Sequence, residues 1–347
     1  MSQTQRELLV LDTVESVREA CAEFQLVATR LREELARVLV GQSAVVEQVL
    51  IALFANGHVL LEGVPGLGKT LLVRTLGRAL GLQFSRIQFT PDLMPADILG
   101  TQIVVENQGR GGRELQFRPG PIFTQILLAD EINRASPKSQ SALLEAMQER
   151  AVTIAGETRA LDHPFLVLAT QNPIEQEGTY PLPEAQLDRF LFKVIVPYAS
   201  RSDVATIVDR TTGVKSPDES TKAVLSASEI HQAQELARRV LVAPHVQDYA
   251  VRVVLATHPH EDPSAAEHSR MVLVGASPRG AQALIAGAKV RALFSGRCAV
   301  STQDIAALIL PSLRHRIVRT FEAEAAGVTC DAILEQITQS VSAEAQP

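Results

Sequence analysis

The chain has 347 residues, more than one hydrophobic core usually organises, so two domains are expected. Hydrophobic residues make up 46% of the chain and charged residues 21%, a balance that excludes a largely disordered protein. The net charge of −6 disfavours a protein that binds nucleic acids mainly by neutralising their phosphates.

The cysteines and the N-terminal residues indicate in which cellular compartment the protein is expected. Cys21, Cys298 and Cys330 are odd in number and far apart, which favours free thiols over a disulfide framework or a zinc site. The first 25 residues carry acids throughout and lack the apolar core of a signal peptide. No stretch approaches the roughly 18 uncharged residues of a membrane span. We therefore expect a soluble, cytoplasmic protein.

Two helices are predicted before the first strand. Apolar residues recur at three- and four-residue spacing from Thr13 to about Val40, which indicates an amphipathic helix. A second helix is predicted within residues 41–57, with Ser43 as its N-cap and Gly57 as its C-terminal stop. Residues 1–34 are assigned to an N-terminal helical segment.

Five short apolar runs then alternate with helical or loop segments. This pattern is typical of strands that are buried on both faces of a parallel sheet. The runs are "HVLLEG" (58–63), "FSRIQF" (84–89), "QILLADE" (125–131), "PFLVLATQ" (164–171) and "FLFKVIV" (190–196). The predicted fold class is therefore α/β, with a parallel sheet flanked by helices.

Residues 101–118, "TQIVVENQGRGGRELQFR", interrupt this alternation. Two extended arms around "NQGRGG" predict a β-hairpin whose glycines supply the turn. Arg110 and Arg113 lie near its tip and would contact another protein. A solvated turn is the alternative interpretation.

Strand signals fade beyond Pro197, and the domain junction is placed near residues 197–203. Residues 200–335 are predicted to be mainly helical, and residues 336–347 to be a flexible tail. One helix opens with a capping box from Ser226 to Glu229, and another starts at Ser277 and Pro278. In a third, "STQDIAALILPSLRHRI", the proline at position 311 is expected to break or kink the helix.

The segment "GVPGLGKT", residues 63–70, matches the phosphate-loop pattern G-x-x-x-x-G-K-[ST]. An apolar strand precedes it and a helical pattern follows. Glycines let successive N–H groups converge on a polyphosphate, and the helix N-terminus favours negative charge. Lys69 would reach the β- and γ-phosphates, and Thr70 would ligate magnesium. The predicted ATP-binding residues are Gly63, Val64, Pro65, Gly66, Leu67, Gly68, Lys69, Thr70 and Leu71.

Three polar residues at strand ends predict the chemistry. Asp130 and Glu131 end the run "ILLADE", at the sheet edge where ligands of parallel sheets bind. Asp130 would hold magnesium and Glu131 would polarise an attacking water; a helix N-cap is the alternative role for the pair. Asn172, at the end of "FLVLATQNP", would lie between the γ-phosphate and that water, unless it only forms a turn. Water as the attacking group implies hydrolysis.

Taken together, "GVPGLGKT", "LLADEINRA", "ATQNP", "LPEAQLDRF" and "GASPRG" resemble the AAA+ ATPases, specifically the MoxR family. The resemblance covers residues 35–320. It implies a P-loop nucleotide-binding domain over residues 35–199 and a helical lid domain over 200–335. The implied protein is a magnesium-dependent ATPase that forms a hexameric ring. It would act as a chaperone that matures client protein complexes, for example by metal-cofactor insertion, with a partner that carries a von Willebrand factor A (VWA) domain.

The resemblance also assigns roles to arginines. Arg189 matches the arginine finger, which acts on nucleotide held by the neighbouring subunit. Arg279 matches the second sensor, which reaches from the lid to the γ-phosphate of its own subunit. Arg134 is a rival for the boundary role, and for Arg134 and Arg189 a salt bridge within the subunit is the alternative. Val40 and Gly41 lie where such proteins contact adenine. The same resemblance makes Gly63–Thr70 the Walker A loop, Asp130 and Glu131 the Walker B pair, and Asn172 the first sensor.

Two other classes of function share the phosphate loop. An AAA+ nucleic-acid motor or loader has the same core, but the acidic balance and the lack of an appended DNA-binding module disfavour it. A small-molecule kinase would have a shorter lid and would lack the paired Asp130 and Glu131 followed by Asn172. Stimulation of hydrolysis by DNA, or a stoichiometric phosphorylated metabolite, would indicate one or the other.

Overall fold

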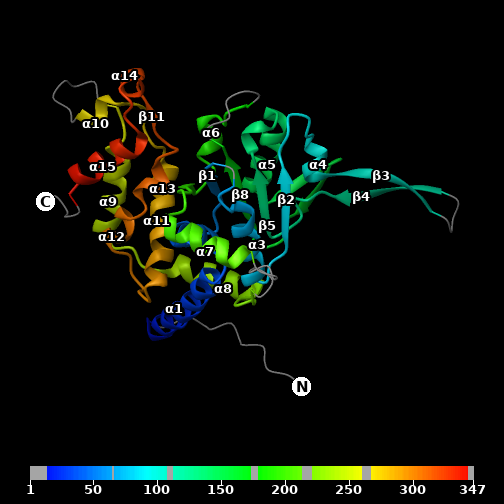
Figure 1. The fold of residues 1–347 in the computed structure, drawn as a ribbon, viewed down its shortest axis with the longest axis horizontal. Helices are drawn as coiled ribbons and strands as arrows, with labels where there is room; N and C mark the ends of the chain where they lie inside the picture. The colour runs from blue at the N-terminus through cyan, green and yellow to red at the C-terminus, as the bar shows by residue number, and fades with distance from the viewer. Residues whose placement is uncertain are drawn as a thin grey trace.

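The computed structural model describes residues 14–64, 66–107, 112–172, 179–212, 221–259 and 267–342. Figure 1 shows a central sheet with helices on its faces, a helical part on one side of it and a two-stranded ribbon that projects from the other side. The predicted order of an α/β part followed by a helical part is therefore confirmed.

All five predicted strands form one parallel sheet. They are β1 (Val59–Glu62), β2 (Phe84–Gln88), β5 (Ile126–Asp130), β8 (Leu166–Gln171) and β9 (Phe192–Ile195). The strand order is β2-β5-β8-β1-β9. In the register, Gln88 lies opposite Asp130, and Glu62 lies opposite Gln171 and Ile195. The carboxyl ends of the strands therefore share one edge, called here the carboxyl edge, and the other end of the sheet is the amino edge.

The three central strands of the sheet are buried on both faces, which explains their apolar runs. Within β1, Leu60 packs into one core cluster while Val59 and Leu61 pack into the other, because successive side chains of a strand point to opposite faces. The first cluster includes residues of α5 (Pro137–Glu149). The larger second cluster includes residues of α1 (Val14–Ala36), α2 (Ser43–Phe54), α3 (Lys69–Ala79) and the later helices.

The two N-terminal helices are confirmed, but the predicted ends of α2 are wrong. Gln42 is the N-cap, and its amide donates to the carbonyl oxygen of Leu67 (2.8 Å) instead of capping the helix. The helix ends at Phe54. Asn56, with φ of 59°, adopts the left-handed conformation after the helix that the sequence predicted for Gly57. Asn tolerates the left-handed region better than most residues, so it can end a helix as glycine does.

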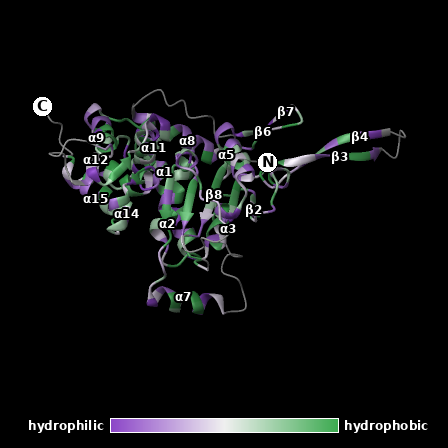
Figure 2. Ribbon diagram, turned by 90° about the horizontal axis from the view of Figure 1, so that it is seen from above, coloured by the Kyte–Doolittle hydropathy of each residue, from purple (hydrophilic) through white to green (hydrophobic). Residues whose placement is uncertain are grey.

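The predicted hairpin over residues 101–118 is confirmed. After the short helix α4 (Pro95–Leu99), β3 (Gly100–Asn107) pairs antiparallel with β4 (Gly112–Pro119), and Figure 2 shows this ribbon extending away from the rest of the chain. Arg113 forms an exposed ion pair with Glu106 (3.8 Å), whereas Arg110 lies outside the described residues. A second hairpin, β6 (Ala151–Ile154) with β7 (Glu157–Ala160), was not predicted; its Ala155–Gly156 turn has positive φ at both residues.

The helical part begins with α7 (Arg201–Thr211), which Figure 2 shows set apart from the other helices. Both predicted helix starts are confirmed, with a capping box from Ser226 to Glu229 and with Ser277 as an N-cap. The remaining elements are α8 (Ala227–Arg239), α9 (Pro244–Leu255), α10 (Glu267–Arg270), β10 (Val272–Val274), α11 (Pro278–Phe294), α12 (Thr302–Ala306), α13 (Ile309–Leu313), β11 (Val318–Arg319), α14 (Phe321–Ala325) and α15 (Cys330–Ser340).

Two predictions in this part are corrected. The break between α12 and α13 falls before Leu308, and Pro311 lies in the first turn of α13, where its missing N–H costs no helical hydrogen bond. The tail prediction over 336–347 is wrong for residues 336–340, which are the end of α15. Ile333, Leu334 and Ile337 are fully buried, so this helix is anchored by its apolar side chains. Residues 343–347 lie outside the described residues.

The N-terminal helix joins the two parts. The ring of Phe24 in α1 lies 5.0 Å from that of Phe54 in α2 and 5.9 Å from that of Phe294 in α11. The amide of Gln234 in α8 donates to the carbonyl oxygen of Leu53 (2.8 Å). None of the helices within the described ranges combines the length and the apolar character of a bilayer span.

Candidate functional site

The loop between β1 and α3 has the backbone of an anion cradle. Gly66 and Gly68 have φ of 86° and 75°, in the left-handed region that glycine adopts without strain. Helix α3 begins at Lys69, and no side chain caps its first N–H groups, so they remain available to an anion. The predicted loop residue Pro65 lies outside the described residues.

The ammonium group of Lys69 folds back over this loop. Its Nζ atom donates to the carbonyl oxygen of Gly63 (2.6 Å). Burial lowers the pKa of Lys69, while the nearby carboxylates of Asp130 and Glu131 oppose that shift. Within the described part of the chain, the hydroxyl of Thr70 makes no hydrogen bond. The loop thus presents a positive charge, free N–H groups and a free hydroxyl to the same space.

The carboxyl edge brings the predicted acids and Asn172 to the same side of the sheet as the loop. Asp130 and Glu131 follow β5, Asn172 follows β8 and the loop follows β1, and these three strands are neighbours in the order β5-β8-β1. Asn172 is buried, at 5% exposure. Its strand lies between the strand that ends in the acids and the strand that leads to the loop. The sequence predicted that the acids and Asn172 each follow a strand, but it did not predict that these strands are neighbours.

Thr170 connects the two acids. Its hydroxyl donates to Oδ1 of Asp130 (2.6 Å) and accepts from the backbone N–H of Glu131 (2.8 Å). Glu131 has a φ of 59°, a costly conformation for a residue with a side chain. The hydroxyl of Thr170 therefore helps to hold Glu131 in this strained turn. Sequence reasoning missed Thr170 because nothing local distinguishes it from the apolar residues around it.

Residues of β2 and η1 (Ile132–Arg134) hold the acids from the other side. Nη2 of Arg86 donates to Oδ2 of Asp130 (2.6 Å), and the amide of Gln88 donates to Oε2 of Glu131 (2.8 Å). Arg134 also pairs with Oε2 of Glu131 (2.9 Å), which is the intra-subunit salt bridge considered for it. Arg86 and Gln88 alternate with buried residues on β2, a period of two that could have identified them from the sequence.

The oxygen atoms at this edge fit magnesium. The carboxylate of Asp130 and the hydroxyl of Thr70 are the hard oxygen ligands that this ion takes, with waters and phosphate oxygens completing its shell. Among the described residues, no cluster of three or more His, Cys, Asp or Glu side chains could hold a metal by itself. Residues 63–70 and Asp130 therefore suit an ion that arrives with a polyphosphate.

The predicted adenine contacts lie beside the loop. Val40 and Gly41 line a cavity of about 400 Å³ together with residues of α1, α2 and α7. Gly41 has φ of 72°, and a Cβ there would lie 2.7 Å from the carboxylate of Asp203 in α7. Gln42 binds the loop carbonyl of Leu67. This segment therefore contacts both the phosphate loop and α7, where a base attached to the phosphates could be held.

Arg189 lies at the opposite end of the sheet. It follows α6 (Glu184–Leu187) and precedes β9, and the N–H of Leu191 donates to the carbonyl oxygen of His58, just before β1 (2.8 Å). From His58 to Gly63 the chain rises about 16 Å, at ~3.3 Å per residue. Nη1 of Arg189 donates to the carbonyl oxygen of Leu144 (2.7 Å). Arg189 is thus remote from the phosphate loop of its own chain, and its bond within the subunit is to a carbonyl rather than a carboxylate.

Arg279 lies near the start of β9 rather than beside the phosphate loop of its own chain. Its Nη1 atom lies 3.8 Å from Oδ2 of Asp188, and the hydroxyl of Ser277 donates to the same oxygen (2.9 Å). The start of α11 therefore lies beside Arg189 at the amino edge, away from its own loop. Sequence reasoning assigned the role of Arg279 by motif, and the motif carries no information on where the lid sits.

Arg316 fastens the helical part to this edge. Its side chain is only 3% exposed, and Nε donates to Oδ1 of Asp188 (2.8 Å). Its other nitrogens donate to the carbonyl oxygens of Phe190 (2.8 Å), Leu191 (3.2 Å) and Ser312. Burial lowers the pKa of Arg316, and the charge of Asp188 opposes that shift. Asp188 and Arg316 thus fix the lid against the segment that carries Arg189, and neither Asp188 nor Arg316 was identified from the sequence.

Two family profiles match the chain. The profile described as "ATPase family associated with various cellular activities (AAA)" matches residues 58–192, and that of the "AAA lid domain" matches residues 264–337. The first contains the loop, the acids, Asn172 and Arg189. The second contains Arg279 and Arg316. The five-stranded parallel sheet and the helical part therefore correspond to an AAA domain and its lid.

Similar proteins of nearly the same length are known. "Chaperone MoxR1" of Mycobacterium tuberculosis is 48% identical over 309 residues, which cover 89% of this chain and 80% of that protein. "Protein MoxR" of Methylorubrum extorquens is 33% identical over 306 residues, covering 84% and 87%. The crystal structure of a "putative ATPase" from Cytophaga hutchinsonii has a TM-score of 0.86 at 39% identity and covers 95% of this chain and 98% of that chain.

Proposed function

This chain belongs to the MoxR family of AAA+ ATPases, and we propose that it is a magnesium-dependent ATP hydrolase that remodels or matures client protein complexes. The observation that carries this proposal is the arrangement at the carboxyl edge. A phosphate loop, a hydrogen-bonded pair of acids and a buried asparagine follow three neighbouring strands. These groups supply an anion cradle, a base and a polar contact for water.

Each residue has a proposed task in hydrolysis. Lys69 binds the β- and γ-phosphates, and the N–H groups at the start of α3 bind the remaining phosphate oxygens. Glu131 accepts a proton from the attacking water, and Asn172 orients that water against the γ-phosphate. Asp130 and Thr70 would hold magnesium, which neutralises negative charge on the phosphates when it is bound. The bond from Thr170 keeps Glu131 in position.

Arg189 and Arg279 are proposed to act on the nucleotide of a neighbouring subunit. Both lie at the amino edge, across the sheet from the loop of their own chain. A head-to-tail ring would bring this edge of one subunit to the carboxyl edge of the next. Arginines supplied in this way stabilise the charge that develops during phosphoryl transfer. We propose a homo-oligomeric ring, hexameric as in the family resemblance, in which each active site is shared.

The proposal also covers the client that the protein acts on, the partner protein that it works with and the cellular compartment. A relative named a chaperone supports a protein complex as the client, and the family resemblance supports metal-cofactor insertion with a VWA-domain partner in the cytoplasm. The projecting β3–β4 ribbon is the proposed contact with that client. Two of its exposed side chains, Val104 and Leu115, lie opposite each other and form an apolar pair on one face.

Loss of the loop lysine tests the proposal directly. We expect Lys69→Ala to weaken ATP binding about 10- to 100-fold, because a charged hydrogen bond to phosphate contributes roughly 1.5–3 kcal/mol. Calorimetry with Mg-ATP measures the affinity, and phosphate release measures turnover before and after EDTA. Lys138→Ala, on the exposed start of α5, is the matched control and should leave both unchanged. Wild-type affinity in Lys69→Ala would contradict the assignment of the loop.

The buried ion pair between Asp188 and Arg316, which joins the lid to the sheet, should contribute strongly to stability. Asp188→Ala leaves the guanidinium of Arg316 buried without its carboxylate, so we expect the free energy of unfolding to fall by about 3–5 kcal/mol. Urea unfolding measures this loss. Asp248→Ala removes an exposed acid that pairs with Arg252 (2.7 Å) and should cost only about 0–1 kcal/mol. Equal losses of unfolding free energy in the two variants would show that the buried ion pair stabilises the fold no more than the exposed one does.

A further inference from the structure

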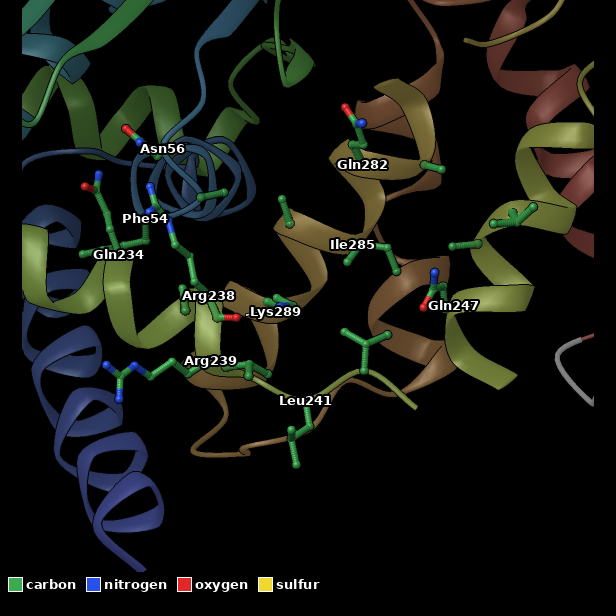
Figure 3. Close-up of a pocket in the computed structure, with 18 residues that line it drawn as sticks. Phe54, Asn56, Gln234, Arg238, Arg239, Leu241, Gln247, Gln282, Ile285 and Lys289 are labelled. Atoms are coloured by element: carbon green, nitrogen blue, oxygen red, sulfur yellow. Dashed lines mark hydrogen bonds between the residues drawn. The ribbon is translucent and has the colours of Figure 1, made fainter. Parts of the chain in front are cut away.

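A cavity of about 760 Å³ lies in the helical part, outside the site described above. The end of α2 and helices α8, α9 and α11 line it, as Figure 3 shows. Phe54 and Asn56 on its wall precede β1, so the cavity lies toward the amino edge of the sheet. None of the described residues of the phosphate loop or of the acid pair lines it. A role in nucleotide binding does not explain it.

The floor of this cavity is apolar and partly open. Leu241 and Val251 are 69% and 40% exposed, which is unusual for aliphatic side chains beside a core. They adjoin small and aliphatic residues of α8 and α11, namely Ala237, Ala281, Ile285 and Ala286. Covering this floor would remove apolar area from water, which favours association with another apolar surface.

The rim of the cavity is positively charged. Arg238, Arg239 and Lys289 line it, and none of its described lining residues is Asp or Glu. Nζ of Lys289 donates to the carbonyl oxygen of Arg238 (2.8 Å), and no carboxylate among the described residues pairs with Lys289. The half-buried position of Lys289 lowers its pKa. Lys289 is therefore a half-buried cation that a carboxylate from outside would compensate.

Other cations stand close to this rim. Burial lowers the pKa of Arg150, and the charge of Arg238 lowers it further. His163 also has a lowered pKa, first from burial and then from the charges of Arg150 and His231, while Asp162 opposes the shift. Glu235 pairs with Arg238 (3.1 Å), but this pair is exposed and screened by solvent.

Amide groups complete the lining. Oδ1 of Asn56 is buried and has no hydrogen-bond donor among the described residues. Gln247 and Gln282 lie on α9 and α11 at the sides of the cavity (Figure 3). Such groups can accept from or donate to the backbone of a bound peptide. The cavity therefore offers apolar contact, positive charge and backbone hydrogen bonds together.

We propose that this cavity is the docking site for a leucine-rich, acidic segment of a partner protein, with its aliphatic side chains on the floor and its carboxylates on Arg238 and Lys289. Apolar anchors surrounded by complementary charge are typical of grooves that bind amphipathic helices. A nucleic acid fits less well, because Phe54 carries the only aromatic ring among the described lining residues, and at 1% exposure this ring offers no stacking platform. The site is independent of the proposed hydrolysis.

The probe is a fluorescein-labelled 14-residue helical peptide with Leu at i, i+3, i+4 and i+7 and Glu at the flanking positions. Fluorescence anisotropy with the full chain measures its Kd at low and at physiological salt. We expect Arg238→Glu combined with Lys289→Glu to weaken binding about 10-fold or more, and Leu241→Ser to weaken it about threefold. Lys138→Glu is the matched charge reversal outside the cavity and should leave the Kd unchanged.

The same peptide with Lys in place of Glu, and a single-stranded DNA, are the competing ligands. The proposal is overturned if the wild type does not bind the Glu peptide, if the double variant binds it as well as the wild type does, or if the Lys peptide binds equally. DNA binding that the double variant abolishes, in the absence of Glu-peptide binding, would assign the rim to nucleic acid. Leu241 is exposed and Lys289 is half-buried, so the single variants Leu241→Ser and Lys289→Gln should fold. Their Kd values test the proposal if the double variant does not fold.

Discussion

Glu131→Gln is expected to bind ATP as the wild type does and to hydrolyse it at least about 100-fold more slowly. An amide cannot accept the proton of the attacking water. It can still accept the hydrogen bonds that Gln88 and Arg134 donate to Glu131, so the shape of the site should be preserved. Phosphate release measures turnover, and calorimetry measures binding in the same preparation.

A matched change separates this effect from a general loss of charge. Glu145→Gln alters an exposed acid on α5 and should leave turnover unchanged. Thr170→Val removes the hydroxyl that fixes the backbone of Glu131 and should lower turnover with little effect on ATP affinity. If Glu131→Gln turned over at the wild-type rate, another group would have to be the base.

The parts of the fold that follow from local patterns were predictable. The three central strands, β5, β8 and β1, are buried on both faces, so each appears in the sequence as an uninterrupted apolar run. The capping box at Ser226 and the proline start at Pro278 are signals contained within four residues. The phosphate loop is also local, because glycines, lysine and threonine must follow one another to wrap an anion.

The parts that depend on distant partners were not predictable. Arg86 and Asp130 are 44 residues apart, and Asp188 and Arg316 are 128 residues apart, yet each pair forms direct hydrogen bonds. No spacing rule connects such residues in a single sequence. The placement of Arg279 followed from the second of these pairs, since Arg316 fixes where the lid meets the sheet. A motif identified the residue, but only the packing of the lid indicates which nucleotide it can approach.

Arg189→Ala subunits are expected to bind ATP and to hydrolyse it about 10³-fold or more slowly, because an arginine supplied from a neighbour is worth about 10³ to 10⁵ in rate. The variant keeps its own loop, acids and asparagine, so the defect lies in the site that it completes for the next subunit. Size-exclusion chromatography with light scattering shows whether the assembly is retained, and phosphate release gives the rate.

Mixed assemblies distinguish shared sites from sites within one chain. When Arg189→Ala and Glu131→Gln subunits combine at random in equal amounts, roughly a quarter of the contacts pair an intact Glu131 with an intact Arg189, so about a quarter of the wild-type rate should return. Arg279→Ala mixed with Glu131→Gln should recover similarly, because Nη1 of Arg279 lies 3.8 Å from Oδ2 of Asp188, the residue before Arg189. If Arg279 served its own subunit instead, no contact in that mixture would be complete, and turnover would stay at the level of the separate variants.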